Sequence, residues 1–331
     1  MRAIQVHVPG GPQALVEAEL PQPEPGPGQL RVRAEAIGVG RPDVLVRSGR
    51  YKWMPPLPAI PGAEMAGVVD AVGLGVSQWQ PGDRVLVSAR DLPVRAGCYA
   101  EAIVVPQQAP YALPASLSAV DAVSLPNLQL AQAMLLGLAG GRMTARTVLV
   151  TGAAGGVATM LTQLARHHGA QVIGTARSAA KRDFARACGC VEVLDPAAAD
   201  LPEQVKALTG GRGVDLAFDS VGERLFIQAI QSLAPLGTAV SYNIVAGPPA
   251  EDVFQVLRSL LGRSLAVRCF SMHTFDEDVA QRRALMQSAI ELMAHGHVRA
   301  PQATLLPLSQ ARRAHELIEG GQTMGKIVLQ P

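Results

Sequence analysis

A turn of small residues carries the clearest chemical signal in this sequence. The stretch TGAAGGVA at 151–158 follows an apolar run at 147–150 and opens an amphipathic run, with the spacing GxxGxxA. A strand that turns through small residues into a helix lets the backbone approach a pyrophosphate, and the positive N-terminal end of the helix faces the anion. A second buried-strand pattern at 170–176 strengthens the motif, so we predict a dinucleotide site. Its candidate contacts are Gly152, Ala154, Gly155, Gly156 and Val157.

The end of the second strand, GTARSAAK at 174–181, indicates which dinucleotide binds. It contains no Asp or Glu to hydrogen-bond a ribose 2′-hydroxyl. Two basic side chains and a serine hydroxyl stand there instead, and charge-assisted hydrogen bonds from them favour a 2′-phosphate. The alternative is that Lys181 and Arg182 are ordinary solvated helix residues. We predict NADPH, with the candidate contacts Thr175, Arg177, Ser178 and Lys181.

The cysteines form neither a metal-binding nor a disulfide pattern. The chain has four of them, and only Cys188 and Cys190 are close in sequence. Nothing nearby completes a four-ligand zinc set, and scattered cysteines in a long chain do not make a disulfide framework. We therefore expect reduced, inert thiols, no metal and a cytoplasmic location.

Size and composition restrict the class of protein further. A chain of 331 residues exceeds the usual size of one core, so two domains are expected. The 29 basic and 27 acidic residues give a net charge of +2 without a basic arm, which argues against a nucleic-acid partner. No window approaches the roughly 18 apolar residues of a membrane helix, and the first residues do not resemble a signal peptide, so we expect no membrane partner.

The chain has three regions with different patterns of apolar and turn residues, and these regions must position the candidate residues. Residues 1 to about 120 have short apolar runs between prolines and glycines, which predicts a mostly antiparallel, barrel-like domain. From about 122 to 267, apolar strand patterns alternate with helix patterns, which predicts βαβ units and a parallel sheet. The remainder is too short to stand alone and is expected to return to the first domain. The predicted division is 1–122 with 268–331, and 123–267.

Several segments, taken in order, resemble one protein family along almost the whole chain. They are VRSGRY (46–51), PGAEMAGVVDAVG (61–73), PGDRV (81–85), VLVTGAAGGVA (148–158), VIGTARSAAK (172–181), GVDLAFDSVG (213–222), AVSYN (239–243) and the tail AHELIEGGQTMGKIVLQP. In this order and spacing the chain resembles the medium-chain dehydrogenase/reductase superfamily, in its zinc-independent quinone oxidoreductase branch. The resemblance implies a GroES-like β-barrel catalytic domain, a doubly wound Rossmann domain and an active-site cleft between them. It also implies a homodimer that extends the Rossmann sheet.

The zinc ligands of related enzymes are missing. Zinc-dependent relatives place a Cys shortly before an Asp, and later a His in a Gly-His-Glu triplet. This chain has GRPD at 40–43 and GAE at 62–64, and it lacks the four-cysteine lobe of a structural zinc. Neither Asp43 nor Glu64 could hold a catalytic zinc without nitrogen or sulfur companions.

The resemblance also assigns residues outside the glycine turn. Tyr242 matches an aromatic position beside the cofactor, and Lys326 matches a lysine near its phosphates. Tyr51 matches a tyrosine that lines the substrate pocket next to the nicotinamide. Arg41 and Asn127 are further candidates for the substrate pocket, although Arg41 also fits a surface arginine in a turn.

Three positions depart from the quinone reductase pattern. Gly40 stands where an Asn usually contacts the nicotinamide carboxamide, Ala131 replaces a Thr, and Pro196 replaces a Tyr near the adenosine. These departures affect the expected nicotinamide geometry and substrate preference more than cofactor binding.

The predicted function is hydride transfer from NADPH to a quinone or a small α,β-unsaturated carbonyl, without zinc. Such a reaction can depend largely on orientation and a few hydrogen-bond donors, and Tyr51 is the candidate donor or simply a wall of the pocket. Alternatives of the same fold are a metal-free alcohol dehydrogenase and an enoyl-thioester reductase, for which Arg47, Arg50 and Lys52 could form a basic entrance. A non-enzymatic, NADPH-binding redox sensor is the other alternative, because the Asn is missing at Gly40.

Overall fold

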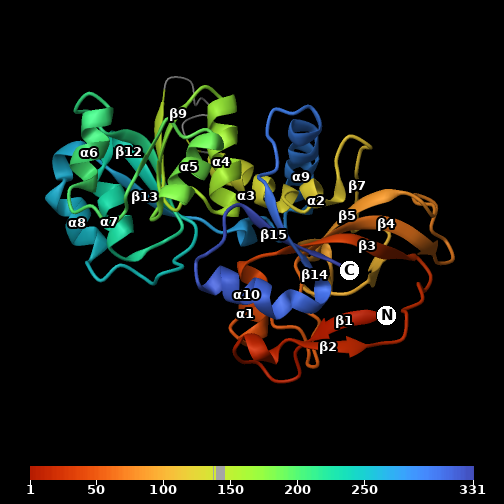
Figure 1. The fold of residues 1–331 in the computed structure, drawn as a ribbon. Helices are drawn as coiled ribbons and strands as arrows, with labels where there is room; N and C mark the ends of the chain where they lie inside the picture. The colour runs from red at the N-terminus through yellow and green to blue at the C-terminus, as the bar shows by residue number, and fades with distance from the viewer. Residues whose placement is uncertain (137, 139–145) are drawn as a thin grey trace. The chain divides into compact units, whose positions relative to one another are not determined.

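A computed structural model describes residues 1–136, 138 and 146–331. The chain divides into two compact units (Figure 1). Unit 1 consists of residues 1–126, 286–296 and 300–331, and unit 2 of residues 127–285 and 297–299. Two helices cross a boundary between the units, α3 (Leu125–Leu135) and α9 (Val279–Ala294).

The strands of unit 1 form a two-stranded antiparallel pair, β1 with β2, and a larger sheet in the order β14-β15-β3-β4-β5-β7, with β6 on β3. They are β1 (Arg2–Gln5), β2 (Val16–Glu19), β3 (Gln29–Val39), β4 (Glu64–Val72), β5 (Arg84–Ser88), β6 (Ala102–Pro106), β7 (Tyr111–Ala112), β14 (Ala303–Pro307) and β15 (Lys326–Gln330). The helices are α1 (Arg41–Arg47), α2 (Ala119–Ala122) and α10 (Ala311–Glu319), with short 3₁₀ helices η1 (Pro12–Ala14), η2 (Ala89–Asp91) and η6 (Leu308–Gln310).

Strand β3 organises the larger sheet of unit 1. Its apolar residues alternate with polar ones from Leu30 to Ala36, and the apolar set is buried, as a half-buried strand requires. β3 pairs antiparallel with β4, β6 and β15, so the tail of the chain closes onto the N-terminal sheet. This confirms the predicted antiparallel first domain and the return of the last strand to it.

Unit 2 contains a parallel sheet in the order β10-β9-β8-β11-β12-β13. Its strands are β8 (Thr147–Val150), β9 (Gln171–Thr175), β10 (Glu192–Leu194), β11 (Val214–Asp219), β12 (Leu233–Ser241) and β13 (Ala266–Cys269). Its helices are α4 (Gly156–His167), α5 (Ala179–Ala187), α6 (Leu201–Leu208), α7 (Glu223–Gln231) and α8 (Val253–Ser259), with η4 (Leu261–Arg263) and η5 (Met272–Phe275).

The strand order of unit 2 reverses between β8 and β11, so the sheet is doubly wound, as predicted. Its apolar strands are buried because helices pack on them, for example α4 against β8 and β9 and α7 against β11 and β12. The carboxyl ends of these strands lie at one edge of the sheet, where such folds bind ligands.

The unit boundaries differ from the predicted domain boundaries. Residues 268–285 belong to unit 2, whereas the sequence suggested that they return to the first domain. The reason is β13, which hydrogen-bonds in parallel to β12 and so extends the sheet of unit 2 beyond residue 267. Residues 123–126 belong to unit 1.

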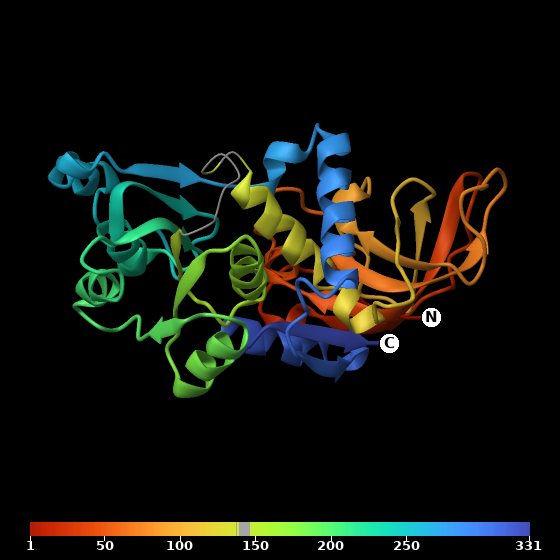
Figure 2. The same cartoon turned by 90° about the horizontal axis from the view of Figure 1, so that it is seen from above.

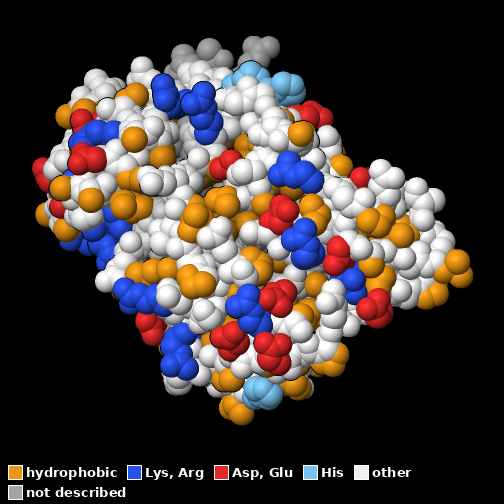
Figure 3. Space-filling view, turned by 45° about the vertical axis from the view of Figure 1, so that its right-hand side comes forward, with side chains coloured by type: hydrophobic (Ala, Val, Ile, Leu, Met, Phe, Trp, Pro, Cys, Tyr) orange, Lys and Arg blue, Asp and Glu red, His pale blue; other side chains and the backbone are white. Residues whose placement is uncertain are grey.

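Basic and acidic side chains intermingle on the face drawn in Figure 3, without a large field of one sign among its described residues. Within the described residues, no helix combines the length and the apolar character that crossing a membrane requires.

Candidate cofactor and substrate site

The predicted pyrophosphate turn lies between β8 and α4. Gly152 adopts φ 58°, a left-handed conformation that favours glycine, and the Gly155 N–H donates to the Gly152 carbonyl at 2.9 Å. Gly155 caps α4 without a side-chain hydrogen bond, so no side chain competes for the N–H groups of the first turn. The five predicted contacts therefore lie in one turn whose backbone suits an anion.

Strand β9 supports this turn from below. The Thr175 hydroxyl accepts a hydrogen bond from the Gly152 N–H at 3.3 Å, and the Thr175 carbonyl accepts one from the Ala153 N–H at 2.9 Å. Thr175 is fully buried, which gives it a supporting place under the turn. A Cβ atom on Gly174 would lie 2.7 Å from the Cβ of Ala153, so only glycine permits this close approach.

A buried aspartate, which was not predicted from the sequence, links the turn to β11. Asp219, the last residue of β11, accepts hydrogen bonds from the Thr151 hydroxyl at 2.5 Å and from the Gly222 N–H at 2.8 Å. Burial raises the pKa of Asp219. The signal in the sequence was an acidic residue at the last position of a strand, directly after the apolar residues 216–218.

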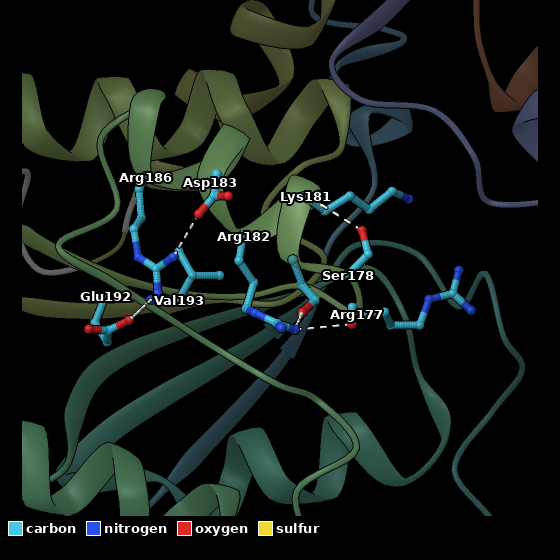
Figure 4. A network of polar contacts seen from close by, with 9 residues as sticks. Arg177, Ser178, Lys181, Arg182, Asp183, Arg186, Glu192 and Val193 are labelled. Carbon is cyan, nitrogen blue, oxygen red and sulfur yellow. Dashed lines mark hydrogen bonds and ion pairs between the residues drawn. The ribbon is translucent and has the colours of Figure 1, made fainter.

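The predicted 2′-phosphate contacts gather where β9 leads into α5 (Figure 4). Ser178 caps α5, with its hydroxyl accepting from the Lys181 N–H at 3.3 Å. Burial and, to a smaller extent, the charge of Arg177 lower the pKa of Lys181. The two cations thus repel each other, and an anion placed between them would relieve this repulsion.

Arg182 has a different role from its neighbours. Its guanidinium donates to the carbonyls of Ala176 and Arg177 at 3.2 and 3.0 Å, and so fastens the end of β9. In Figure 4 the side chains of Arg177 and Lys181 extend to one side of this strand end, away from Arg186. Arg182 is therefore not a simple solvated residue.

Tyr242 lies beside Asp219 at the carboxyl edge of the sheet. Its N–H donates to the Asp219 carbonyl at 2.9 Å, directly after β12. The hydroxyl is buried without a hydrogen bond of normal geometry, and burial raises the pKa of Tyr242 to about 12. The phenol therefore stays protonated, and its place beside the cofactor stays a prediction.

The substrate-pocket candidates are distributed over both units. Arg41 begins α1, and Tyr51 follows that helix in unit 1, with its ring centroid 5.8 Å from that of Trp53. Asn127 lies in α3 and belongs to unit 2. Their meeting in one pocket stays a prediction.

Lys326 lies in the interior of unit 1 rather than on a surface. Its ammonium group forms a buried ion pair with Glu64. Burial lowers the pKa of Lys326 to about 8, and the Asp43 carboxylate opposes this effect. The structure therefore gives the ammonium carboxylate neighbours, and its predicted contact with cofactor phosphates stays a prediction.

Asp43 belongs to the same buried group. Its carboxylate accepts from the Gly40 N–H at 2.8 Å and from the Tyr99 hydroxyl at 3.3 Å, and burial raises its pKa to about 6. The two acidic residues that align with the zinc motifs, Asp43 and Glu64, thus have protein partners. Among the described residues, no group of three or more His, Cys, Asp or Glu side chains could hold a metal ion.

Arg47 cannot serve in the basic entrance considered above. It is buried, and its guanidinium makes two hydrogen bonds of 2.8 Å to the Glu319 carboxylate, which ties α1 to α10. The same layer contains His315, whose Nε2 lies 3.0 Å from the Tyr99 hydroxyl. Burial lowers the pKa of His315 to about 3, so this imidazole is neutral.

Comparison with known proteins agrees with this arrangement. Residues 26–115 match the alcohol dehydrogenase GroES-like domain, and residues 156–293 match the zinc-binding dehydrogenase family. The chain is 31% identical to a 2-haloacrylate reductase of Burkholderia sp, over 99% of this chain and 98% of that protein. It is 30% identical to a quinone oxidoreductase of Rattus norvegicus, over 99% and 97%. A mycobacterial structure complexed with NADPH superposes with a TM-score of 0.87 at 33% identity, covering both chains completely.

A GroES-like domain followed by a doubly wound domain with a phosphate turn defines a nicotinamide-dependent oxidoreductase. The chain belongs to the medium-chain dehydrogenase/reductase superfamily, in its quinone oxidoreductase branch.

The close packing under the phosphate turn predicts the effect of a single methyl group. In Gly174→Ala, the new Cβ would lie 2.7 Å from Ala153 Cβ and 2.9 Å from Cys190 Sγ, so the turn must move. We expect affinity for NADPH and NADH to fall together by about tenfold or more. The measurement is fluorescence titration of each cofactor. Gly262→Ala is the matched control, because nothing lies within 4 Å of the added atom, and equal affinity in both variants would contradict the prediction.

The neutral, buried His315 predicts a pH dependence of stability. Its folded-state pKa, about 3, lies below the ordinary value of 6.5, so the unfolded chain binds the extra proton and stability falls as pH drops below about 6.5. Between pH 7 and pH 5 this one group should cost about 2 kcal/mol. His315→Gln should therefore lose less stability over this interval than the wild type, measured by urea unfolding. The exposed control His7→Gln should follow the wild type, and parallel losses in all three proteins would contradict the account.

Proposed function

We propose that the protein is an NADPH-dependent oxidoreductase that reduces a quinone or a small α,β-unsaturated carbonyl without a metal. The observation that supports NADPH over NADH is the corner after β9. There, Arg177, Ser178 and Lys181 follow the strand within residues 174–181, a stretch that contains no Asp or Glu. A 2′-phosphate fits this corner because it would accept charge-assisted hydrogen bonds from both cations.

The protein's own residues would bind and orient the reactants. The N–H groups at the start of α4 would bind the pyrophosphate, and Thr175 would keep the turn in place. NADPH, when bound, supplies the hydride. Tyr51 would donate a hydrogen bond to the substrate oxygen as negative charge develops there, which is the main need of a metal-free reduction.

Two relatives support the substrate class. The 2-haloacrylate reductase is named for an α,β-unsaturated acid, and the rat protein for quinones. Both substrates have a C=C bond conjugated to a carbonyl group, so both can accept a hydride in the same type of reaction. Arg41, at the start of α1, would add a contact for a substrate that carries a carboxylate.

The enoyl-thioester alternative loses part of its support. Of its three entrance residues, Arg47 is buried against Glu319, while Arg50 and Lys52 remain exposed. The sensor alternative predicts cofactor binding without turnover, so the assay below separates it from the proposal.

We also propose a homodimer in the cytoplasm. β13 is one of the two edge strands of the parallel sheet, and a strand at an edge offers unpaired backbone groups to a second copy (Figure 1, Figure 2). All four cysteines are free, which suits a reducing compartment.

The function itself is tested by turnover. We expect NADPH to be oxidised in the presence of quinones or short enones, with EDTA causing no loss and NADH reacting more slowly. The measurement is the absorbance of the reduced nicotinamide across a panel that includes enoyl-CoA esters and simple aldehydes. Tight NADPH binding with no turnover on the panel would contradict the proposal and favour a sensor.

The phosphate corner predicts a change in cofactor selectivity. Arg177→Ala and Lys181→Ala should each weaken NADPH binding by about 10- to 100-fold and leave NADH binding almost unchanged. Arg186→Ala is the control on the same helix, because Arg186 pairs with Asp183 and Glu192 instead. Equal losses for the two cofactors would place the 2′-phosphate elsewhere.

Tyr51 is tested by removing one oxygen atom. Tyr51→Phe should lower kcat by about tenfold or more if the hydroxyl stabilises the developing charge, without changing the Kd of NADPH. Stopped-flow measurement of a single turnover isolates this step. An unchanged rate would contradict a role for the hydroxyl and would leave Tyr51 only as a residue that lines the pocket.

A further inference from the structure

A histidine–carboxylate pair follows the last strand of the parallel sheet and has no place in the function described so far. His273 lies in η5, between β13 and α9 in the sequence, and its Nδ1 is 3.0 Å from the Asp276 carboxylate. A carboxylate in this position selects one tautomer of the imidazole, fixes the orientation of the ring and stabilises its protonated form.

The backbone around the pair is firmly held. The buried guanidinium of Arg282 donates to the carbonyls of Phe275 and Asp276 at 2.7 and 2.9 Å. The Gln129 side chain donates in turn to the Arg282 carbonyl at 2.8 Å, and Met272 is buried beneath the turn. The Asp276 N–H closes the turn on the His273 carbonyl at 3.1 Å. The hydrogen bonds from this buried arginine hold the backbone of the short turn in one position, and with it the His273–Asp276 pair.

The topology places the pair at one particular end of the cofactor edge. Ser241 and Cys269 are partners at the carboxyl ends of β12 and β13, and the Phe270 N–H donates to the Ser241 carbonyl at 2.8 Å. The segment that carries His273 therefore leaves the same edge of the sheet as the phosphate turn. In a doubly wound sheet a dinucleotide crosses the point where the strand order reverses, which here lies between β8 and β11.

The direction of the dinucleotide along this edge follows from its 2′-phosphate. The basic corner lies after β9, on one side of the reversal, so the adenosine half belongs there. The nicotinamide half must then extend over β11, β12 and β13, on the side of His273.

We propose that His273, oriented by Asp276, is the proton donor that completes the reduction. This inference rests on the proposed function. As hydride bonds to the β-carbon of an enone, the C=C π pair shifts to join the α-carbon to the carbonyl carbon, and the C=O π pair moves onto the oxygen to form an enolate. The proton at Nε2 of the imidazolium then bonds to the α-carbon as the carbonyl reforms. The products are the saturated ketone and the oxidised cofactor, and water returns the proton to His273.

Histidine suits this step because its proton is available near neutral pH, whereas a phenol gives up its proton less readily. Asp276 is a positioning residue for His273.

The location of His273 is tested without turnover. In long-range ¹H–¹⁵N spectra of the full-length protein, the His273 ring signals should shift on addition of NADP⁺, which carries a nicotinamide. They should not shift with 2′,5′-ADP, which fills only the adenosine end. The signals are assigned by their loss in His273→Gln, and His7 serves as the unresponsive control. Identical responses to the two ligands, or none to NADP⁺, would overturn the placement.

The proton transfer is tested with 2-methylcyclohex-2-enone, in which protonation of the α-carbon creates a stereocentre. The wild type should give predominantly one configuration at that carbon. His273→Gln should give a nearly equal mixture and lower kcat by about 100-fold, with the Kd of NADPH unchanged. Asp276→Asn should show the same defects to a smaller extent, because it keeps the imidazole but loses its orientation.

The outcomes separate the two levels of the proposal. A His273→Gln variant that keeps the rate and the single configuration refutes the proton-donor role while the proposed function stands. Loss of configuration in Tyr51→Phe instead would assign the proton to that residue and refute the role of His273. A wild-type enzyme that reduces neither this enone nor any quinone refutes the proposed function and the inference with it.

Discussion

The structure of unit 2 depends on one constraint: the backbone at the start of α4 must stay open to an anion while β9 packs directly beneath it. Gly152 takes a left-handed conformation, Gly174 leaves room for Ala153, and Thr175 holds the turn through its hydroxyl. Asp219 then ties the turn to β11 through Thr151. An extra methyl group here would displace the turn, and a capping side chain would occupy the N–H groups that an anion needs, so the site depends on small residues.

The rest of the cofactor edge follows from the order of the strands. Reversal between β8 and β11 separates a basic corner after β9 from the segments that follow β11, β12 and β13. The first half offers charge, through Arg177 and Lys181. On the second side lie Tyr242 and the His273–Asp276 pair, for which we propose packing against the cofactor and proton transfer. A dinucleotide that lies across the reversal would therefore have its 2′-phosphate bound at one end and its nicotinamide beside the reacting groups at the other. A hydride-transfer enzyme requires this division.

The sequence predicted the local features well because they depend on neighbouring residues. Each strand of the parallel sheet, the glycine turn and the corner after β9 lies within a short stretch whose pattern indicates its local structure, while the cofactor contacts of these residues stay predictions. Long-range pairs were not predictable in this way. Lys326 pairs with Glu64, which is 262 positions away, and Arg47 pairs with Glu319, which is 272 positions away. Neither ion pair has a signal in the local sequence. Asp219 was overlooked because one acidic residue at a strand end carries no spacing signal. The 268–285 segment was misplaced because β13 is short and only its partner β12 reveals it.

The most direct test of the central claim follows the hydride itself. The enzyme would be given NADPH that carries deuterium at the transferable C4 position, together with a short enone in ordinary water, and the product would be analysed by mass spectrometry and NMR. The account predicts one deuterium at the β-carbon of the saturated ketone and none at the α-carbon, whose hydrogen comes from water. A product without deuterium, or no product although NADPH is bound, would contradict a hydride-transferring enzyme and would require a different role for the cofactor edge.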